Sequence, residues 1–136
     1  MWISRRTDYA SRALLALTLS EGGPLTLAAL AEATEAPVSV LEQVMPALRK
    51  AGLVRSERGR SGGYRLNGPP EDITLERVVR LFEGQLAPIG YATRRHPDPC
   101  PELVSLTLRP VWEEVRDETI RILERTTFAD LAAQAR

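Results

Sequence analysis

Residues 41–66 of the chain read LEQVMPALRKAGLVRSERGRSGGYRL, and the hydrophobic period changes at Gly52. Before this glycine the apolar residues recur at the spacing of one helical face. After it, two short strand-forming runs, 53–58 and 64–66, flank the glycine-rich segment 59–63, a pattern that predicts a hairpin. The helical stripe consists of Leu41, Val44, Met45 and Leu48. The stretch therefore predicts a helix followed by a β-hairpin with a basic tip.

The start and the middle of this helix carry two further signals. Ser39 and Glu42 have the spacing of a capping box, which predicts that the helix begins at this point. Pro46 lies inside the helix, where it removes one hydrogen bond and costs about 3 kcal/mol unless packing compensates. We therefore expect a kink or a loosened turn at Pro46.

Three more helices are expected around this stretch. Upstream, residues 4–21 and 27–33 have helical patterns, and Thr26 is positioned to cap the second of them. Downstream, residues 75–83 form an amphipathic run between a capping Thr74 and Gly84. Three helices before a hairpin are the order of a winged helix-turn-helix. The predicted fold is mainly α with a small β-hairpin, and residues 1–84 form its DNA-binding head.

The remainder of the chain is predicted to form a loop and a long helix. Residues 85–109 contain many prolines and are assigned to a loop with one short helix, whereas residues 110–136 form a long helix and a C-terminal tail. The segment after residue 125 is either a short final helix or a mobile tail. The long helix carries an apolar stripe, for which there are two alternatives. The stripe either forms the contact between two chains of a dimer or packs back on the first helix of a monomer. Its members are Val111, Val115, Ile122 and Leu123.

Composition limits the classes of function. The 136 residues include 18 basic and 18 acidic ones, but six basic residues and only Glu57 on the acidic side fall between positions 49 and 65. The single cysteine and single histidine provide neither a disulfide nor a closed zinc site, and no constellation of acid, base and nucleophile is visible, so an enzyme is not expected. With no membrane-spanning run and no signal peptide, the expected location is the cytoplasm.

The candidate DNA-contacting residues lie on the third helix and the hairpin. Ser39, Glu42 and Gln43 occupy its first exposed turn, where side chains of these types meet base edges. Ser39 and Glu42 would alternatively act only as a cap. Arg58 and Arg60 form the basic hairpin tip, which suits a narrow minor groove but would also fit a solvated turn. Arg5 and Arg49 complete the predicted DNA-binding set.

The chain resembles the Rrf-two (Rrf2) family of bacterial transcription regulators over nearly its whole length. The resemblance rests on residues 41–66, on RTDYASRALLAL at 6–17, on ITLERVVRLFEG at 73–84, and on Trp112 together with TTFADL at 126–131. It implies a homodimeric regulator, most often a repressor, whose long C-terminal helices cross. It also implies a double-stranded DNA operator, with the third helix in the major groove and the wing in the minor groove.

The same resemblance implies a sensor site in the loop of residues 85–109, but most of the side chains that ligate a cluster in other members are missing here. Cluster-bearing members carry three cysteines and a histidine at positions that match Arg94, Cys100, Leu106 and Arg109 here. We therefore predict no cofactor or metal. The alternative is an iron–sulfur cluster shared between subunits, with Cys100 and His96 as ligands and Asp8 as an oxygen ligand.

Cys100 has two further interpretations. It is either an inert thiol or a redox or alkylation sensor whose thiolate is favoured by the neighbouring basic residues. Arg94 and Arg95 would bind a small anion or remain solvated. The rival to a DNA-binding regulator is a winged-helix module that binds a protein instead of DNA, and an unidentified effector or protein partner is left open.

Overall fold

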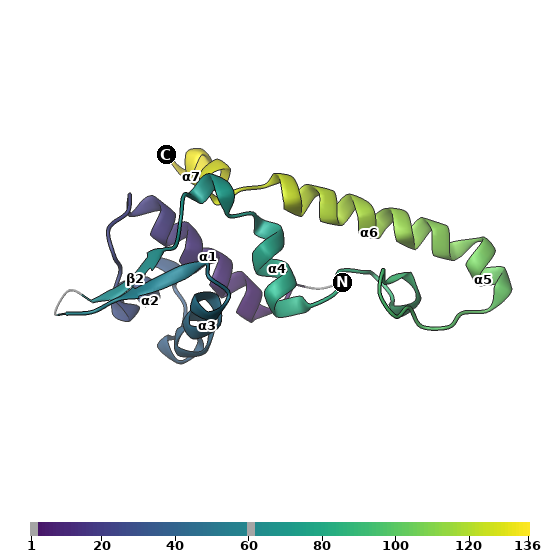
Figure 1. The fold of residues 1–136 in the computed structure, drawn as a ribbon, viewed down its shortest axis with the longest axis horizontal. Coiled ribbons are helices and arrows are strands. Elements are labelled where there is room, and N and C mark those ends of the chain that lie inside the picture. The colour runs from purple at the N-terminus through teal and green to yellow at the C-terminus, as the bar shows by residue number, and fades with distance from the viewer. Residues whose placement is uncertain (1–2, 60–61) are drawn as a thin grey trace.

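The computed structural model describes residues 3–59 and 62–136. It has a head at one end and an arm made mainly of one long helix at the other (Figure 1). The mainly helical fold with one antiparallel hairpin agrees with the predicted fold class. Its elements are α1 (Arg5–Leu19), α2 (Leu27–Thr34), α3 (Val38–Lys50), β1 (Val54–Glu57), β2 (Gly63–Leu66), η1 (Pro70–Asp72), α4 (Leu75–Glu83), η2 (Gly90–Ala92), α5 (Glu102–Leu106), α6 (Leu108–Arg125) and α7 (Phe128–Ala135).

One hydrophobic core holds the head together. Helix α1 packs against α2, α3, α4 and α7, and its buried face contains Leu14 and Leu17. Helix α3 buries the predicted apolar stripe, of which Leu41 and Met45 are fully excluded from solvent. Fully burying one such side chain stabilises the fold by roughly 1.5–3 kcal/mol. The packing of α3 is therefore firm, and only its opposite face is available to a partner.

The start of α3 differs from the prediction. The residue that precedes the helix is Pro37, and no side chain caps the helix there. Ser39 lies inside the first turn, so the predicted capping box of Ser39 and Glu42 is wrong. Pro37 has extended backbone angles, φ −60° and ψ 137°, and α3 begins directly after it without a serine cap. By contrast, Thr26 and Thr74 cap α2 and α4 as predicted, each accepting a backbone hydrogen bond.

Pro46 does not interrupt α3. The helix is continuous from Val38 to Lys50, and the proline ring lies on its exposed face. The predicted loosened turn is therefore not found, whereas the alternative of a kink at Pro46 stays a prediction. The neighbours Val44, Met45 and Leu48 are all fully buried, and their packing offsets the hydrogen bond that the proline cannot donate.

The hairpin gains a third strand-like segment from the loop before α2. Strands β1 and β2 pair antiparallel with Val54 opposite Leu66. On the other edge, the amide of Tyr64 donates to the carbonyl of Leu25 at 2.8 Å, and the amide of Leu25 donates to the carbonyl of Tyr64 at 3.0 Å. A Cβ atom at Gly63 would lie 2.2 Å from the Leu25 carbonyl oxygen, so only glycine fits there. The wing is thus fixed to the head along this edge.

The arm leaves the head after α4 and returns along α6 (Figure 1). The loop from residue 84 runs outward through η2, α5 turns the chain at the far end, and α6 leads back to the head. At the root of the arm, Ile120 of α6 is buried against Val79 of α4 and Leu86 of the loop. No described helix is both long and apolar enough to cross a membrane.

The final segment is a helix of the head and not a mobile tail. Phe128 at the start of α7 is completely buried in the head core, and α7 packs on α1. Two backbone hydrogen bonds, from Leu75 to Thr126 at 2.8 Å and from Phe128 to Ile73 at 3.0 Å, join this segment to the start of α4. The predicted grouping of residues 110–136 therefore combines an arm helix with a head helix. The alternative in which the α6 stripe packs on α1 is wrong, since α7 lies there instead.

Candidate nucleic-acid interface

The exposed face of α3 is mostly polar, with Val38 and Pro46 as its apolar members. Ser39, Glu42 and Gln43 are solvent-exposed in its first turns, and Arg49 and Lys50 are exposed in its last turn. Because α3 is not capped by a side chain, Ser39 and Glu42 make no capping hydrogen bond, and their hydrogen-bonding groups remain available to a partner. The helix therefore presents short and medium polar side chains at one end and cations at the other.

Arg49 connects this helix to the wing. Its Nη1 donates a hydrogen bond of 3.2 Å to Oγ of Ser56 in β1. The guanidinium uses one of its five N–H donors in this contact, so others can reach a phosphate. The helix and the hairpin therefore present one continuous surface.

The wing carries cations of two kinds. Arg65 is half-buried and bonded to Glu57, and this hydrogen bond lowers the pKa of the Glu57 carboxyl below its ordinary value. Arg55 and Arg58 are exposed, and Arg58 precedes Gly59, whose φ of +111° turns the chain. Arg55 lies directly opposite Arg65 across the hairpin, and Glu57 already compensates the charge of Arg65. Arg60, also predicted in the wing, lies outside the described residues.

The surface formed by α3 and the wing has four cations without acidic partners. Among residues 3–59 and 62–136, none of the four takes part in a salt bridge. Sequence reasoning selected Arg49 and Arg58 as DNA-binding residues but omitted the other two, although their charge and exposed strand or helix-end positions were visible. The four are Arg49, Lys50, Arg55 and Arg58.

Arg5 is exposed in the first turn of α1, beside the far end of α4. Its neighbours are held there: the backbone amide of Ser4 donates to Glu83 at 2.8 Å, and the guanidinium of Arg6 lies 5.4 Å from the centre of the Phe82 ring. No hydrogen bond or ion pair within the described chain links Arg5 to α3 or to the wing. The structure thus gathers the predicted residues of α3 and the wing but leaves Arg5 apart from them.

Comparison with known proteins identifies this arrangement. A family model described as "Rrf2: Iron-dependent Transcriptional regulator" matches residues 3–134. The chain belongs to the Rrf2 family. It is 33% identical to the HTH-type transcriptional regulator CymR of Bacillus subtilis over 98% of this chain and 91% of that protein. It is 32% identical to the regulator IscR of Photobacterium profundum over 96% of this chain and 75% of that protein.

Solved structures give the same answer for the fold. The structure of CymR, the global cysteine regulator of B. subtilis, matches with a TM-score of 0.83 and 32% identity and covers 98% of both chains. IscR of T. potens matches with a TM-score of 0.77 and 30% identity, covering 100% of this chain and 89% of that one. This Rrf2-family protein is therefore a winged-helix DNA-binding transcription regulator.

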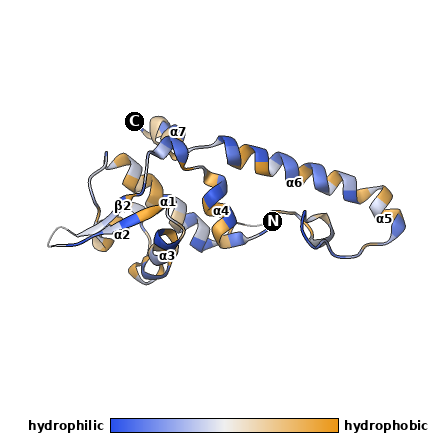
Figure 2. Ribbon diagram, in the orientation of Figure 1, coloured by the Kyte–Doolittle hydropathy of each residue, from blue (hydrophilic) through white to orange (hydrophobic). Residues whose placement is uncertain are grey.

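The long helix of the Rrf2-family chain exposes most of the predicted apolar stripe. Val111, Val115 and Ile122 are 50%, 41% and 49% exposed, and Leu108 extends the row at 50%. Figure 2 shows hydrophobic residues recurring among hydrophilic ones along α6. Leu123 is different, because it packs against the small cluster at the root of the arm. Its assignment to dimerisation stays a prediction, and Leu108 is an exposed apolar residue of α6 that was not among the predicted stripe residues.

The sensor candidates of this Rrf2-family chain are dispersed. Asp8 is bonded to Arg12 at 2.8 Å, His96 is exposed in the arm loop with a φ of +50°, and Cys100 is a half-buried free thiol before α5. Within the described ranges, no three His, Cys, Asp or Glu side chains come together as a group that could hold a metal ion. The donors of one chain therefore do not fit an iron centre, although the matching family is described as iron-dependent.

The arm loop is nevertheless an ordered part of the Rrf2-family fold. Nη1 of Arg116 donates to the carbonyl of Ala92 at 2.7 Å, and Arg94 pairs with Asp117 at 3.0 Å. Nε of Arg116 also donates to Oδ1 of Asp117 at 2.9 Å. This hydrogen bond first, and that from Arg94 second, lower the pKa of the Asp117 carboxyl. The side chains of α6 thus hold the loop along the helix.

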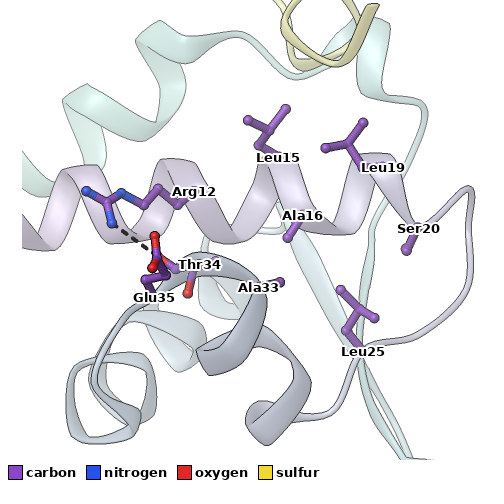
Figure 3. A pocket seen from close by; sticks show the side chains of 9 residues that line it. All are labelled: Arg12, Leu15, Ala16, Leu19, Ser20, Leu25, Ala33, Thr34 and Glu35. Carbon is purple, nitrogen blue, oxygen red and sulfur yellow. Dashed lines mark hydrogen bonds between the residues drawn. The ribbon is translucent and has the colours of Figure 1, made fainter. Parts of the chain in front are cut away.

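A hollow of about 590 Å³ lies between α1 and α2 of this Rrf2-family head (Figure 3). Leu15, Leu19 and Leu25 give it an apolar wall. Arg12 crosses one end and donates to the carbonyl of Thr34 at 3.1 Å. No residue of the predicted DNA-binding or sensor sets lines this hollow, so it is separate from both.

Proposed function

We propose that this protein is a homodimeric repressor that binds a palindromic operator with α3 in the major groove and the wing in the adjacent minor groove. It acts by binding DNA and not by catalysis. The observation that carries the proposal is the continuous surface of α3 and β1, in which exposed polar side chains on the helix are bordered by four cations without acidic partners.

The polar turn of α3 supports base recognition. A major groove admits an α-helix, and the first turns of the inserted helix meet the base edges. Gln43 can form two hydrogen bonds with adenine, and Glu42 can accept one from cytosine. Both are exposed and make no side-chain hydrogen bond to another described residue. These two residues are therefore our candidates for reading sequence.

The cations support phosphate and minor-groove contacts. Each phosphate neutralised by Lys or Arg releases a counterion, so binding must weaken as salt rises. Arg58 stands beside a glycine turn, where the backbone can approach the duplex closely. Arginine is also the side chain attracted to a narrow minor groove. We assign this role to Arg58 and the phosphate contacts to Arg49, Lys50 and Arg55.

The α6 stripe supports the dimer. Positions 108, 111, 115 and 122 follow the 3.5-residue repeat of a helix pair, and their side chains are 41–50% exposed in the single chain. An apolar row of this kind is stabilised when a second helix covers it. A second copy of α6 is our assigned partner. Two heads joined in this way would contact half-sites about one helical turn apart and block access to the DNA between them.

The test begins with selection of bound duplexes from a random DNA pool, followed by anisotropy titrations of the selected duplex at several salt concentrations. We expect an imperfect palindrome. Arg58→Ala should lower the slope of log affinity against log salt by up to about 1.8, because the proposed dimer loses one cation at each of two half-sites and each is worth about 0.9. Gln43→Ala should reduce discrimination at one base pair per half-site by about 1–3 kcal/mol. Arg125→Ala, which removes an exposed arginine of α6, is the matched control.

Two results would overturn the proposal. If no duplex is enriched, the protein is better described as a winged-helix module that binds another protein. If Arg58→Ala and Gln43→Ala both leave the salt slope and the base preference of the selected duplex unchanged, DNA binds elsewhere on the molecule.

A further inference from the structure

A second cavity lies where the head, the arm loop and α6 meet. Its volume is about 560 Å³, within the usual range for sites that hold small molecules. Three arginines from two separate segments line it, and no carboxylate does. The lining residues are Arg80, Gly84, Gln85, Leu86, Arg94, Arg95 and Ile120. The fold thus joins Arg80 of α4 to the Arg94–Arg95 pair of the loop, a convergence that is not visible in the sequence.

Two of these arginines are fixed by carboxylates that lie outside the cavity wall. Arg80 bonds to Glu76 one turn earlier in α4 through Nε, and Arg94 bonds to Asp117 of α6 through Nη2 at 3.0 Å. Each contact uses one nitrogen of a guanidinium that has five N–H donors. The remaining donors can bind a ligand, while the ion pairs limit the movement of the side chains.

Arg95 is held in a different way. The side-chain amide of Gln85 forms two hydrogen bonds with the backbone of Arg95. It donates to the carbonyl of Arg95 at 3.0 Å and accepts from the backbone amide of Arg95 at 3.1 Å. The hydroxyl of Thr93 also donates to the same carbonyl at 3.0 Å. Within the described chain, the guanidinium of Arg95 makes neither a hydrogen bond nor a salt bridge. The backbone of Arg95 is therefore fixed at the cavity, and its exposed guanidinium has no carboxylate partner among the described residues.

The apolar part of the cavity wall has its own consequence. Leu86 and Ile120 are each only 4% exposed and belong to the cluster at the root of the arm. The guanidinium groups themselves remain solvated, since the side chains of Arg80 and Arg94 are 52% and 57% exposed, so water partly screens each contact with an anion. A compact molecule with several anionic groups can engage the three guanidinium groups together, and the site therefore suits such a ligand better than a single solvated ion.

We propose that this cavity binds a small polyanion carrying phosphate or carboxylate groups, which the guanidinium groups of Arg80, Arg94 and Arg95 recognise through charge-assisted hydrogen bonds. The planar fork of arginine matches both kinds of group. The ligand would touch the head through α4, the loop through Arg94 and Arg95, and the arm through Ile120. The site does not depend on the proposed DNA function, because its occupation can be measured without DNA.

The test is calorimetric titration of the full-length protein in a low-salt chloride buffer. Pyrophosphate and citrate serve as probes and distinguish a phosphate from a carboxylate ligand. We expect saturable binding of at least one probe, with one ligand per chain, and at least about a tenfold loss of affinity in Arg95→Gln. This variant keeps the backbone contacts with Gln85. Arg125→Gln changes the same charge on α6 outside the cavity and should bind as the wild type does.

Three outcomes would overturn the site. The first is that neither pyrophosphate nor citrate binds the wild type. The second is that Arg95→Gln and Arg125→Gln bind the probe equally well, which would mean that the probe is attracted to a basic surface in general. The third is that Arg95→Gln, with no probe present, weakens binding of the selected DNA duplex as much as Arg58→Ala does, which would make Arg95 part of the DNA surface. Failure of DNA binding in the wild type would leave the calorimetric result unaffected.

Discussion

Nη1 of Arg49 donates a 3.2 Å hydrogen bond to Oγ of Ser56, and this contact joins the last turn of α3 to the first strand of the wing. The same guanidinium belongs to the set of cations assigned to phosphate. One residue thus combines support of the wing with a charge at the DNA surface, and the two roles can be separated by changing one partner at a time.

Ser56→Ala removes the support and keeps the charge, whereas Arg49→Ala removes both. We expect Ser56→Ala to lower affinity for the selected duplex by at most about threefold, because it removes only one hydrogen bond to an exposed and uncharged acceptor. Arg49→Ala should lower affinity by about tenfold or more at low salt and reduce the salt slope by about 1.8, which is about 0.9 for each half-site of the proposed dimer. Anisotropy titrations at several salt concentrations measure both quantities. Equal salt slopes in the two variants would show that Arg49 only supports the wing.

Gly63→Ala should detach the wing edge. The new Cβ would lie 2.2 Å from the carbonyl oxygen of Leu25, which is part of the backbone and cannot move aside alone. We expect a loss of about 1–3 kcal/mol in the free energy of unfolding, as in other overpacked sites. Denaturant unfolding followed by circular dichroism measures this loss. Wild-type stability in the variant would mean that the pairing of Leu25 with Tyr64 contributes little to the fold.

The dimer is tested by a charge on the α6 stripe. Val115 is 41% exposed in the single chain, so Val115→Glu should leave the head folded and convert the dimer into monomers. Light scattering gives the mass, and circular dichroism reports the fold. Ala133→Glu places the same side chain on the exposed face of α7 and should leave the dimer intact. A wild-type mass of one chain at micromolar concentration would rule out the model with two half-sites.

The pH dependence of stability should include Glu83. The hydroxyl of Thr7 and the amide of Ser4 donate to its Oε1, and these hydrogen bonds, that of Thr7 foremost, lower the pKa of Glu83 below its ordinary value of 4.5. A carboxyl with a lowered pKa in the folded state stabilises the protein fully above its unfolded pKa, and this contribution is lost as the pH falls through the folded value.

Glu83→Gln should therefore be less stable than the wild type at pH 7, and the difference should shrink as the pH is lowered below 4.5. Urea unfolding of both proteins between pH 7 and pH 3 measures it. A constant difference across this range would mean that the carboxylate charge has no part in holding the start of α1 to the end of α4.

Iron content tests the sensor residues. Because the donors of one chain do not gather into a group, we expect protein purified without oxygen to be colourless and to hold no stoichiometric iron or sulfide. Cys100→Ser should leave the absorption spectrum unchanged. Visible bands with stoichiometric iron that disappear in Cys100→Ser would instead require a cluster shared between two subunits.

Elements whose signals are local could be predicted from the amino-acid sequence alone. The stripe from Leu41 to Leu48 predicts an amphipathic α3, and the glycines after it predict the hairpin, because both patterns arise within one element. Thr26 and Thr74 were recognisable as caps for the same reason. The exposed polar residues in the first turns of α3 follow directly, since the opposite face of the helix must be buried.

Features that depend on contacts between distant segments became visible only in the folded chain. Ile122 and Leu123 are adjacent in sequence, yet one is exposed and the other packs into the root of the arm. One residue turns a helix by about 100°, so their roles depend on where α4 lies. The docking of Phe128 in the head core and the convergence of Arg80 with Arg94 and Arg95 arise in the same way, from contacts between segments far apart in the chain.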